Sequence, residues 1–239
     1  MTIQTHTLSN GLRIVTEDMP GLKSASIGVW VQVGGRHERL EQNGIAHFLE
    51  HMAFKGTPTR TSLQIAEAIE DVGGFINAYT SRENTPYYAR VLQQDERPAM
   101  NLIADILRNS LFEMADVDVE RGVILQEIGM TNDTPDDVVF DWLQEVAFPD
   151  QALGRTILGP AERINAFQPT DLRKFVGEHY GPNQMIIAAA GGIDHDEIVK
   201  QAEALFGDMS PLTRPQTLLE PAAFGGGEVR RIKDLDQVH

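Results

Sequence analysis

The sequence has 239 residues, of which 41% are hydrophobic, and its formal net charge at pH 7 is −15. This length and apolar content suit one large domain, or a compact domain and the start of another. Because the sequence contains no cysteine, disulfides and cysteine-ligated zinc are excluded, and a metal site must use His, Asp and Glu. The negative charge argues against a nucleic-acid partner, because the phosphate backbone would be repelled.

No apolar run approaches the roughly 18 to 20 residues of a membrane-spanning helix. The first residues lack the basic and apolar regions of a secretory signal. We therefore expect a soluble, cytoplasmic protein with no membrane partner.

The N-terminal segment has the pattern of three strands. Residues 5–8 and 12–16 flank Ser9-Asn10-Gly11, which predicts a hairpin. Residues 24–33 alternate between apolar and polar side chains and stop at Gly34-Gly35, as is typical of a half-buried strand.

Two helices and two strands are predicted next. The first helix covers residues 43–55, and the second begins at a capping box in which Gln64 follows Thr61 by three residues. Residues 75–80 and 87–93 then have the pattern of two strands.

Most of the remaining elements are helical. We predict one further strand at 185–190 and helices at 96–110, 117–131, 136–147, 170–180 and 194–206. Strands and helices are grouped rather than strictly alternating, which favours an α+β fold with a mixed or antiparallel sheet covered by helices.

The composition changes after residue 206. We predict one domain over residues 1–206, a linker rich in proline and glycine over 207–227, and a strand-like segment over 228–239.

The helix predicted at 43–55 carries the sequence His47-Phe48-Leu49-Glu50-His51. On a helical wheel, His47, Glu50 and His51 fall within an arc of about 100°, and the apolar residues fall on the opposite side. Two histidines four residues apart suit two imidazoles that bind one tetrahedral cation. Glu50 is better placed to accept a proton from water that the metal activates. This is the inverted zinc motif HxxEH; the alternative is a surface helix that happens to carry two histidines.

A catalytic zinc site needs a third protein ligand. Glu120 and Glu127 lie seven residues apart in a predicted helix that begins near Asp116, and they are about 20° apart on the wheel. Both sit in an apolar stripe, where a carboxylate is costly unless it is paired. The alternative is that both reach solvent or pair with arginines such as Arg121. Sequence geometry does not decide which glutamate is the ligand.

Together these residues resemble the pitrilysin-type, or insulinase-type, zinc peptidases, which include insulin-degrading enzyme and the mitochondrial processing peptidase. Glu127 follows His51 by 76 positions, the separation found in this family. The resemblance covers essentially the whole sequence and rests on residues 43–57, 74–85, 120–127, 158–159, 180–183 and 191–192.

The resemblance implies a role for each site residue. His47, His51 and Glu127 would be zinc ligands, and Glu50 would be the general base. Glu120 would support the site from one heptad earlier. A third segment, Asn77-Ala78-Tyr79, resembles the edge strand that pairs with an extended peptide substrate, although its pattern alone predicts an ordinary edge strand.

The resemblance also implies a zinc-dependent endopeptidase with a second half of comparable size. We expect the sequence to be the N-terminal half, with residues 228–239 as the start of a second half that is cut short. Activity is then expected to depend on the second half. The site would be completed by that half, or by a partner subunit in a homodimer or heterodimer.

Two other functions are alternatives to this one. A non-catalytic scaffold subunit is the main alternative, and the presence of all four motif residues argues against it. The HxxEH enzyme that cleaves S-ribosylhomocysteine is rejected, because it uses a cysteine ligand and this sequence has none.

Overall fold

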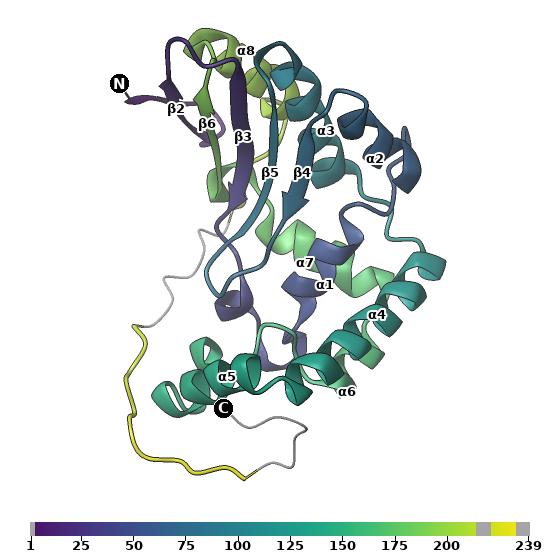
Figure 1. Ribbon diagram of the computed structural model, residues 1–239, viewed down its shortest axis with the longest axis vertical. Helices are drawn as coiled ribbons and strands as arrows, with labels where there is room; N and C mark the ends of the chain where they lie inside the picture. Colours follow the sequence, from purple (N-terminus) through teal and green to yellow (C-terminus); the bar gives the residue numbers. More distant parts are fainter. Residues whose placement is uncertain (1–2, 214–220, 233–239) are drawn as a thin grey trace.

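One six-stranded mixed sheet organises the chain (Figure 1). The computed structural model describes residues 3–213 and 221–232. The strand order is β1-β2-β6-β3-β5-β4; β2 and β6 are parallel, and the other neighbouring pairs are antiparallel. The strands are β1 (Ile3–Thr7), β2 (Arg13–Asp18), β3 (Ser24–Val31), β4 (Phe75–Ala78), β5 (Thr85–Leu92) and β6 (Met185–Gly191).

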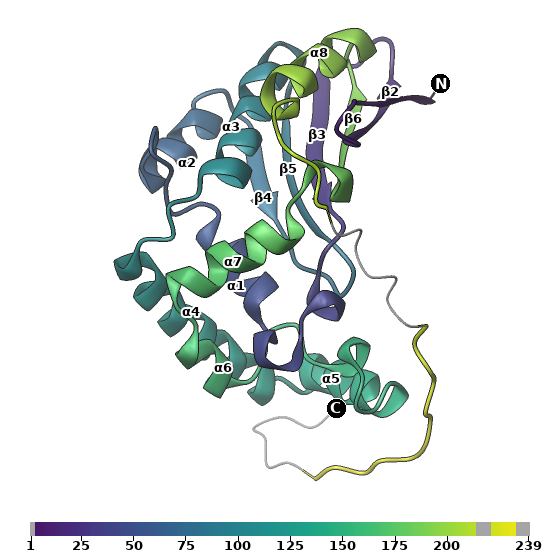
Figure 2. The ribbon, with the colours of Figure 1, turned by 180° about the vertical axis from the view of Figure 1, so that it is seen from behind.

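The helices form two groups around this sheet. Helices α3 and α8 pack against it, and α2 lies beside α3 and β4. Helices α1, α4, α5, α6 and α7 lie beyond its lower end in Figure 1, as the reverse view in Figure 2 also shows. The α-helices of the described residues are α1 (Ile45–Met52), α2 (Ser62–Glu70), α3 (Glu96–Asn109), α4 (Met114–Asp133), α5 (Pro135–Ala147), α6 (Ala161–Ala166), α7 (Pro169–His179) and α8 (His195–Phe206). The predicted α+β class with a mixed, helix-covered sheet is confirmed.

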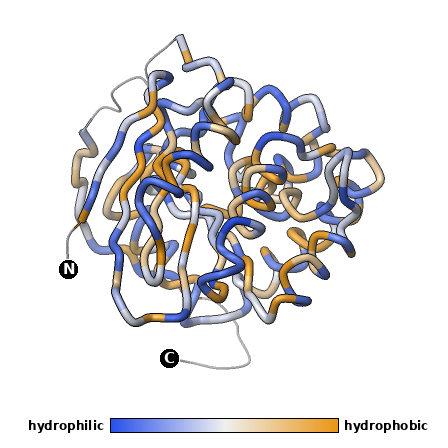
Figure 3. The backbone as a smooth tube through the Cα atoms, turned by 90° about the horizontal axis from the view of Figure 1, so that it is seen from above, coloured by the Kyte–Doolittle hydropathy of each residue, from blue (hydrophilic) through white to orange (hydrophobic). Residues whose placement is uncertain are grey.

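The two faces of the sheet have different surroundings. Along β6 the side chains alternate, so that Ile187 is fully buried and Ile186 is half-buried on the opposite face. The face that carries Ile187 meets the helices. The other face lines a cavity of about 490 Å³ beside Trp30 and Ala188. Figure 3 shows apolar stretches along the strands that build this core.

The predicted elements match the structure closely, with differences at their ends. Helix α1 is shorter than predicted, because Gly44 has a left-handed conformation with φ of 97° and lies outside the helix. Strand β5 starts two residues earlier than predicted and includes Pro86. Helix α6 was not predicted, because six residues are too few to show a helical period.

The strand predicted at 228–239 is wrong for the residues that the structure describes. Residues 228–232 have no regular structure, and they pair with no strand of the described sheet. A strand needs a neighbour for its backbone hydrogen bonds, and alternating side chains do not supply one. Residues 233–239 lie outside the described residues.

Within residues 3–213 and 221–232, no helix is both long enough and apolar enough to cross a bilayer.

The two faces of β6 give a stability test with adjacent residues. We expect Ile187→Ala to lower the free energy of unfolding by about 2–5 kcal/mol, because it leaves a cavity in the core. Ile186→Ala, on the accessible face, should cost less than about 1.5 kcal/mol. Urea unfolding of both variants measures the difference, and equal losses would contradict the assignment of the two faces.

Candidate metal centre

The N-terminus of α1 is held by a buried carboxylate from an earlier loop. Glu38 accepts hydrogen bonds from the backbone N–H of Gly44 at 2.9 Å, from that of Ala46 at 2.9 Å and from Asn43 Nδ2 at 3.0 Å. Burial raises the pKa of Glu38, and these hydrogen bonds oppose the shift. The first N–H groups of a helix have no partner within it and form the positive end of its dipole. The Glu38 carboxylate supplies both an acceptor for these N–H groups and a negative charge at this end.

Close backbone packing fixes the same helix start. A Cβ atom at Gly44 would lie 2.7 Å from the carbonyl oxygen of Leu158, and one at Gly159 would lie 2.4 Å from that of Asn43. Both glycines also have positive φ. The turn at residues 158–159 therefore packs directly on the start of α1. This close approach explains why both positions are glycine, although they are far apart in the sequence.

The side chains of His47 and His51, one turn apart on α1, converge with that of Glu127 from α4. Glu127 Oε2, from α4, lies 3.6 Å from His47 Nε2 and 3.4 Å from His51 Nε2. The two imidazole rings have centroids 4.7 Å apart, and the three ligand atoms lie within 4.8 Å of one another. Ligand atoms about 2.0–2.2 Å from a tetrahedral zinc would lie about 3.3–3.6 Å apart. The donor set and its spacing therefore fit a zinc ion.

The protonation of the two histidines is set by burial and by the carboxylates. Burial, reinforced by the nearby His51, lowers the pKa of His47 to about 4, which keeps its imidazole in the neutral form that binds metals. Burial would also lower the pKa of His51, but hydrogen bonds to Glu127 and Glu120 outweigh it and raise that pKa.

Glu120 contacts His51 from the other side of its ring. Its Oε2 lies 2.9 Å from His51 Nδ1, and its Oε1 lies 2.6 Å from Lys55 Nζ. Burial would raise the pKa of Glu120, but its hydrogen bonds to Lys55 and His51 lower it, so the carboxylate stays ionised. An ionised Glu120 can accept the Nδ1 proton of His51, and Nε2 would then be the nitrogen that binds a metal in place of its proton.

The alternative in which both glutamates reach solvent or pair with arginines does not hold for Glu120. Arg121 pairs with Asp118 and donates to the carbonyl oxygens of Ile164 and Phe167. Glu120 is 5% exposed and pairs within the site, whereas the Glu127 side chain is 42% exposed at its open side.

Glu50 lies beside the cluster and is held from the sheet. Its Oε2 accepts a hydrogen bond from Thr80 Oγ1 at 2.7 Å, and Thr80 follows β4 by two residues. Burial raises the pKa of Glu50, and the hydrogen bond from Thr80 opposes this shift. A partly buried carboxylate with a raised pKa can both accept and return a proton near neutral pH.

The segment Asn77-Ala78-Tyr79 lies along the edge of the sheet. Asn77 and Ala78 belong to β4, the last strand in the sheet order, and Tyr79 continues the pairing by donating its N–H to the carbonyl oxygen of Pro86 at 3.3 Å. The next residue, Thr80, makes the contact with Glu50. One hydrogen bond thus joins the end of the edge strand to Glu50, the residue that precedes His51 on α1.

Three residues of this centre did not emerge from sequence reasoning as members of the site: Glu38, Lys55 and Thr80. Lys55 and Thr80 lie inside segments that resemble the zinc peptidases, which is the signal that could have identified them. Glu38 gave no such signal, because its role depends on the path of the loop before α1.

The sequence matches two family models. Residues 13–161 match the family described as "Insulinase (Peptidase family M16)", and residues 166–239 match "Peptidase M16 inactive domain". Strand β6, from the second matched segment, lies between β2 and β3 of the first. The two matched segments therefore build one sheet.

Relatives cover the chain almost completely. A probable mitochondrial-processing peptidase subunit beta of Arabidopsis thaliana is 48% identical over 95% of this chain and 44% of its own length. An uncharacterized zinc protease of Streptomyces coelicolor is 46% identical over 90% of this chain and 47% of its own length. The chain thus spans about half the length of these curated relatives.

A solved structure shares the fold. The crystal structure of a protease from Helicobacter pylori superposes with a TM-score of 0.85, over 93% of this chain and 54% of that one, at 22% sequence identity.

The buried cap on α1 predicts a stability effect at a residue outside the metal cluster. In Glu38→Gln, an amide N–H₂ would face a backbone N–H, so one helix donor loses its acceptor. We expect a loss of about 1–3 kcal/mol in the free energy of unfolding. Glu41→Gln, at an exposed carboxylate three residues later, should cost less than about 0.5 kcal/mol. Thermal or urea unfolding compares the two, and an equally small loss for both would refute the capping role.

Proposed function

The chain belongs to the insulinase family, peptidase family M16, and on this basis we propose that it carries the zinc site of a metalloendopeptidase. The observation that carries the proposal is the convergence of His47, His51 and Glu127 beside the carboxylate of Glu50. In this proposal His47 and His51 hold the metal through their Nε2 atoms, and Glu127 holds it through a carboxylate oxygen. Zinc, when bound, would polarise the scissile carbonyl and lower the pKa of a water molecule toward about 7.

Glu50 then acts as the general base. It accepts a proton from the attacking water and returns it to the leaving amine. Glu50 therefore ends the reaction as the carboxylate that began it. The hydrogen bond from Thr80 occupies one carboxylate oxygen, and the other would accept the proton. Glu120 holds the His51 ring in the required orientation and tautomer.

The substrate would be a peptide or an unfolded segment, bound as an added strand on β4. Because Tyr79 N–H points to β5, the N–H of Ala78 points away from it, toward the open edge of the sheet. That N–H is 2.9 Å from the side-chain oxygen of Asn77. A substrate carbonyl that pairs with Ala78 would therefore displace the Asn77 side chain, which frees its amide to bind the substrate.

A complete enzyme would contain more than this chain. The curated relatives are about twice as long, and some are named as beta subunits of a processing peptidase. We propose that a second half, or a partner subunit in a homodimer or heterodimer, covers the open side of the metal centre, and that the protein acts in the cytoplasm.

Zinc content and peptide cleavage together test the proposal. We expect about one zinc per chain, whereas a non-catalytic scaffold would carry none. Glu50→Gln should keep the zinc and lower kcat by about 10²–10⁴-fold, because the proton acceptor is lost.

Cleavage should be measured on this chain alone and on a version extended to the length of its relatives. Glu70→Gln, at the exposed end of α2, is the matched control. Cleavage at the full rate by Glu50→Gln in the extended protein would rule out the role given to Glu50.

The role of Glu120 is tested by zinc affinity. Glu120→Gln removes the charge that accepts the His51 Nδ1 proton, so we expect a 10–100-fold weaker affinity for zinc. Glu113→Gln, at the exposed start of α4, should leave the affinity unchanged. Competition with a chromophoric chelator measures both, and equal affinities would show that Glu120 does not support the site.

A further inference from the structure

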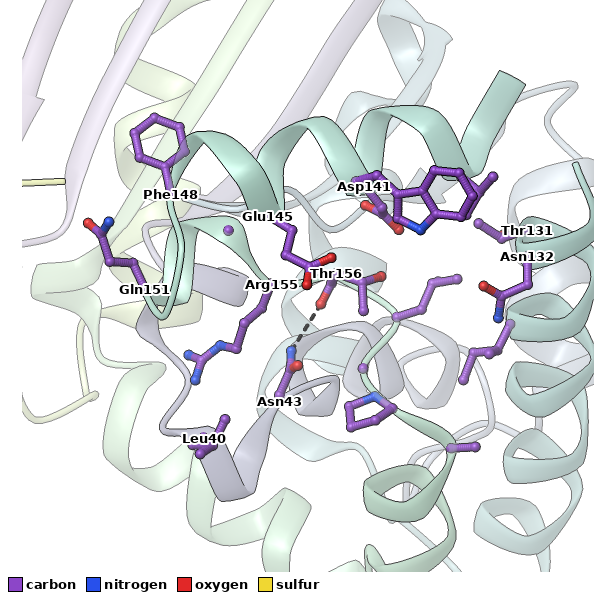
Figure 4. Close-up of a pocket in the computed structure, with 18 of the residues that line it drawn as sticks. Leu40, Asn43, Thr131, Asn132, Asp141, Glu145, Phe148, Gln151, Arg155 and Thr156 are labelled. Carbon is purple, nitrogen blue, oxygen red and sulfur yellow. Dashed lines mark hydrogen bonds between the residues drawn. The ribbon is translucent and has the colours of Figure 1, made fainter. Parts of the chain in front are cut away.

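A second cavity lies on the side of α5, apart from the metal centre. Its volume is about 810 Å³, and His47, His51 and Glu127 are not among its lining residues. Asp141 and Glu145 enter it from α5, and Asn43 and Arg155 enter it from the opposite side (Figure 4). Trp142 adds an aromatic wall. The cavity is therefore acidic and aromatic along α5, which suits a guanidinium group.

Residues 221–232, which we call the strap, run along this helix. Gln151 holds the backbone of Ala223 with two hydrogen bonds: its Nε2 donates to Ala223 O at 2.8 Å, and its Oε1 accepts from Ala223 N at 2.9 Å. Gly225 N–H donates to Ala147 O at 2.9 Å. Between these points the Phe224 ring meets the Phe148 ring edge-on, with centroids 6.3 Å apart.

The other end of the strap reaches the cavity through Arg231. Its guanidinium lies 2.7 Å from Glu145 Oε2 and 5.2 Å from the centre of the Trp142 ring, and its side chain is 35% exposed. The preceding Arg230 has an 87% exposed side chain and pairs with Glu228 of the strap itself. Of these two adjacent arginines, Arg231 lines the cavity and Arg230 does not.

Helix α5 depends on such contacts, because its own packing is sparse. Val138 is its one buried residue, and Phe140 and Leu143 are exposed. Asp141 ties the helix to Arg82, in the loop that follows β4, with 3.3 Å between their charged atoms. The strap adds contacts at Glu145, Trp142 and the residues that follow the helix.

We propose that the cavity beside α5 is a receptor for the chain's own strap and that Arg231 is the side chain it recognises. The guanidinium lies over the indole of Trp142 while it pairs with Glu145, an arrangement that a lysine ammonium reproduces poorly. The strap then leaves the domain along a fixed path on α5, and it is not the free linker that its proline and glycine content predicts. The proposal is independent of the peptidase function.

Trp142 provides a direct optical test. The sequence contains two tryptophans, so Trp30→Phe leaves Trp142 as the single reporter. In that background we expect Arg231→Ala to make Trp142 more accessible to acrylamide quenching and to shift its emission to the red. Arg230→Ala removes the same charge from the adjacent position and should change neither quantity.

Amide hydrogen exchange tests the strap itself, and it needs no Trp30 substitution if that variant folds poorly. Arg231→Ala should speed exchange at the Gly225 amide about tenfold, the factor expected for losing a cation–π contact and an ion pair together. Gln151→Ala should speed exchange at Ala223 while Trp142 quenching stays the same. Arg231→Lys should lie between the unchanged chain and Arg231→Ala.

Two results would overturn the proposal. If Arg231→Ala matches the unchanged chain in both quenching and exchange, the strap is not held by the cavity. If Arg230→Ala and Arg231→Ala release the strap equally, the net charge of the segment holds it, and recognition of Arg231 by Trp142 and Glu145 is wrong.

Discussion

The hydrogen bond between Glu120 and His51 is the interaction on which the metal centre depends. A carboxylate that is 5% exposed would be costly to ionise on its own, and here Lys55 and the His51 ring compensate its charge from two sides. With Nδ1 engaged, His51 can present only its Nε2 lone pair to a cation. Glu127, one heptad further along α4, completes the donor set on the more exposed side. In the proposed site, the two glutamates of one helix thus have different tasks because they lie at different depths.

The rest of the fold keeps α1 in register with this pair. Glu38 satisfies the first N–H groups of the helix, and the turn at residues 158–159 packs on its first turn, so its N-terminus is fixed by two separate loops. At the sheet, Thr80 joins the edge strand β4 to Glu50. A peptide added to that edge would therefore be aligned with the general base and with the metal through one short, continuous set of contacts.

The sequence predicted the parts of the centre that are local and periodic. Helical spacing alone predicts that His47, Glu50 and His51 lie on one face of a helix. Helical spacing could not separate Glu120 from Glu127, because the wheel places them only about 20° apart; their difference is burial, which depends on how α4 crosses α1. Thr80 and Glu38 depend on loops that bring distant residues together. The strand expected at residues 228–239 is wrong for the described residues 228–232, because alternation does not provide a partner strand. Arg231, in this segment, contacts α5 instead.

The most direct measurement is the position and coordination of zinc in crystals of the zinc-loaded chain, located by anomalous diffraction. The expected result is one ion bound by Nε2 of His47, Nε2 of His51 and a carboxylate oxygen of Glu127, at about 2.0–2.2 Å, with Glu120 hydrogen-bonded to His51 Nδ1. An ion bound by Glu120, or by a histidine Nδ1, would contradict the division of roles between the two glutamates of α4.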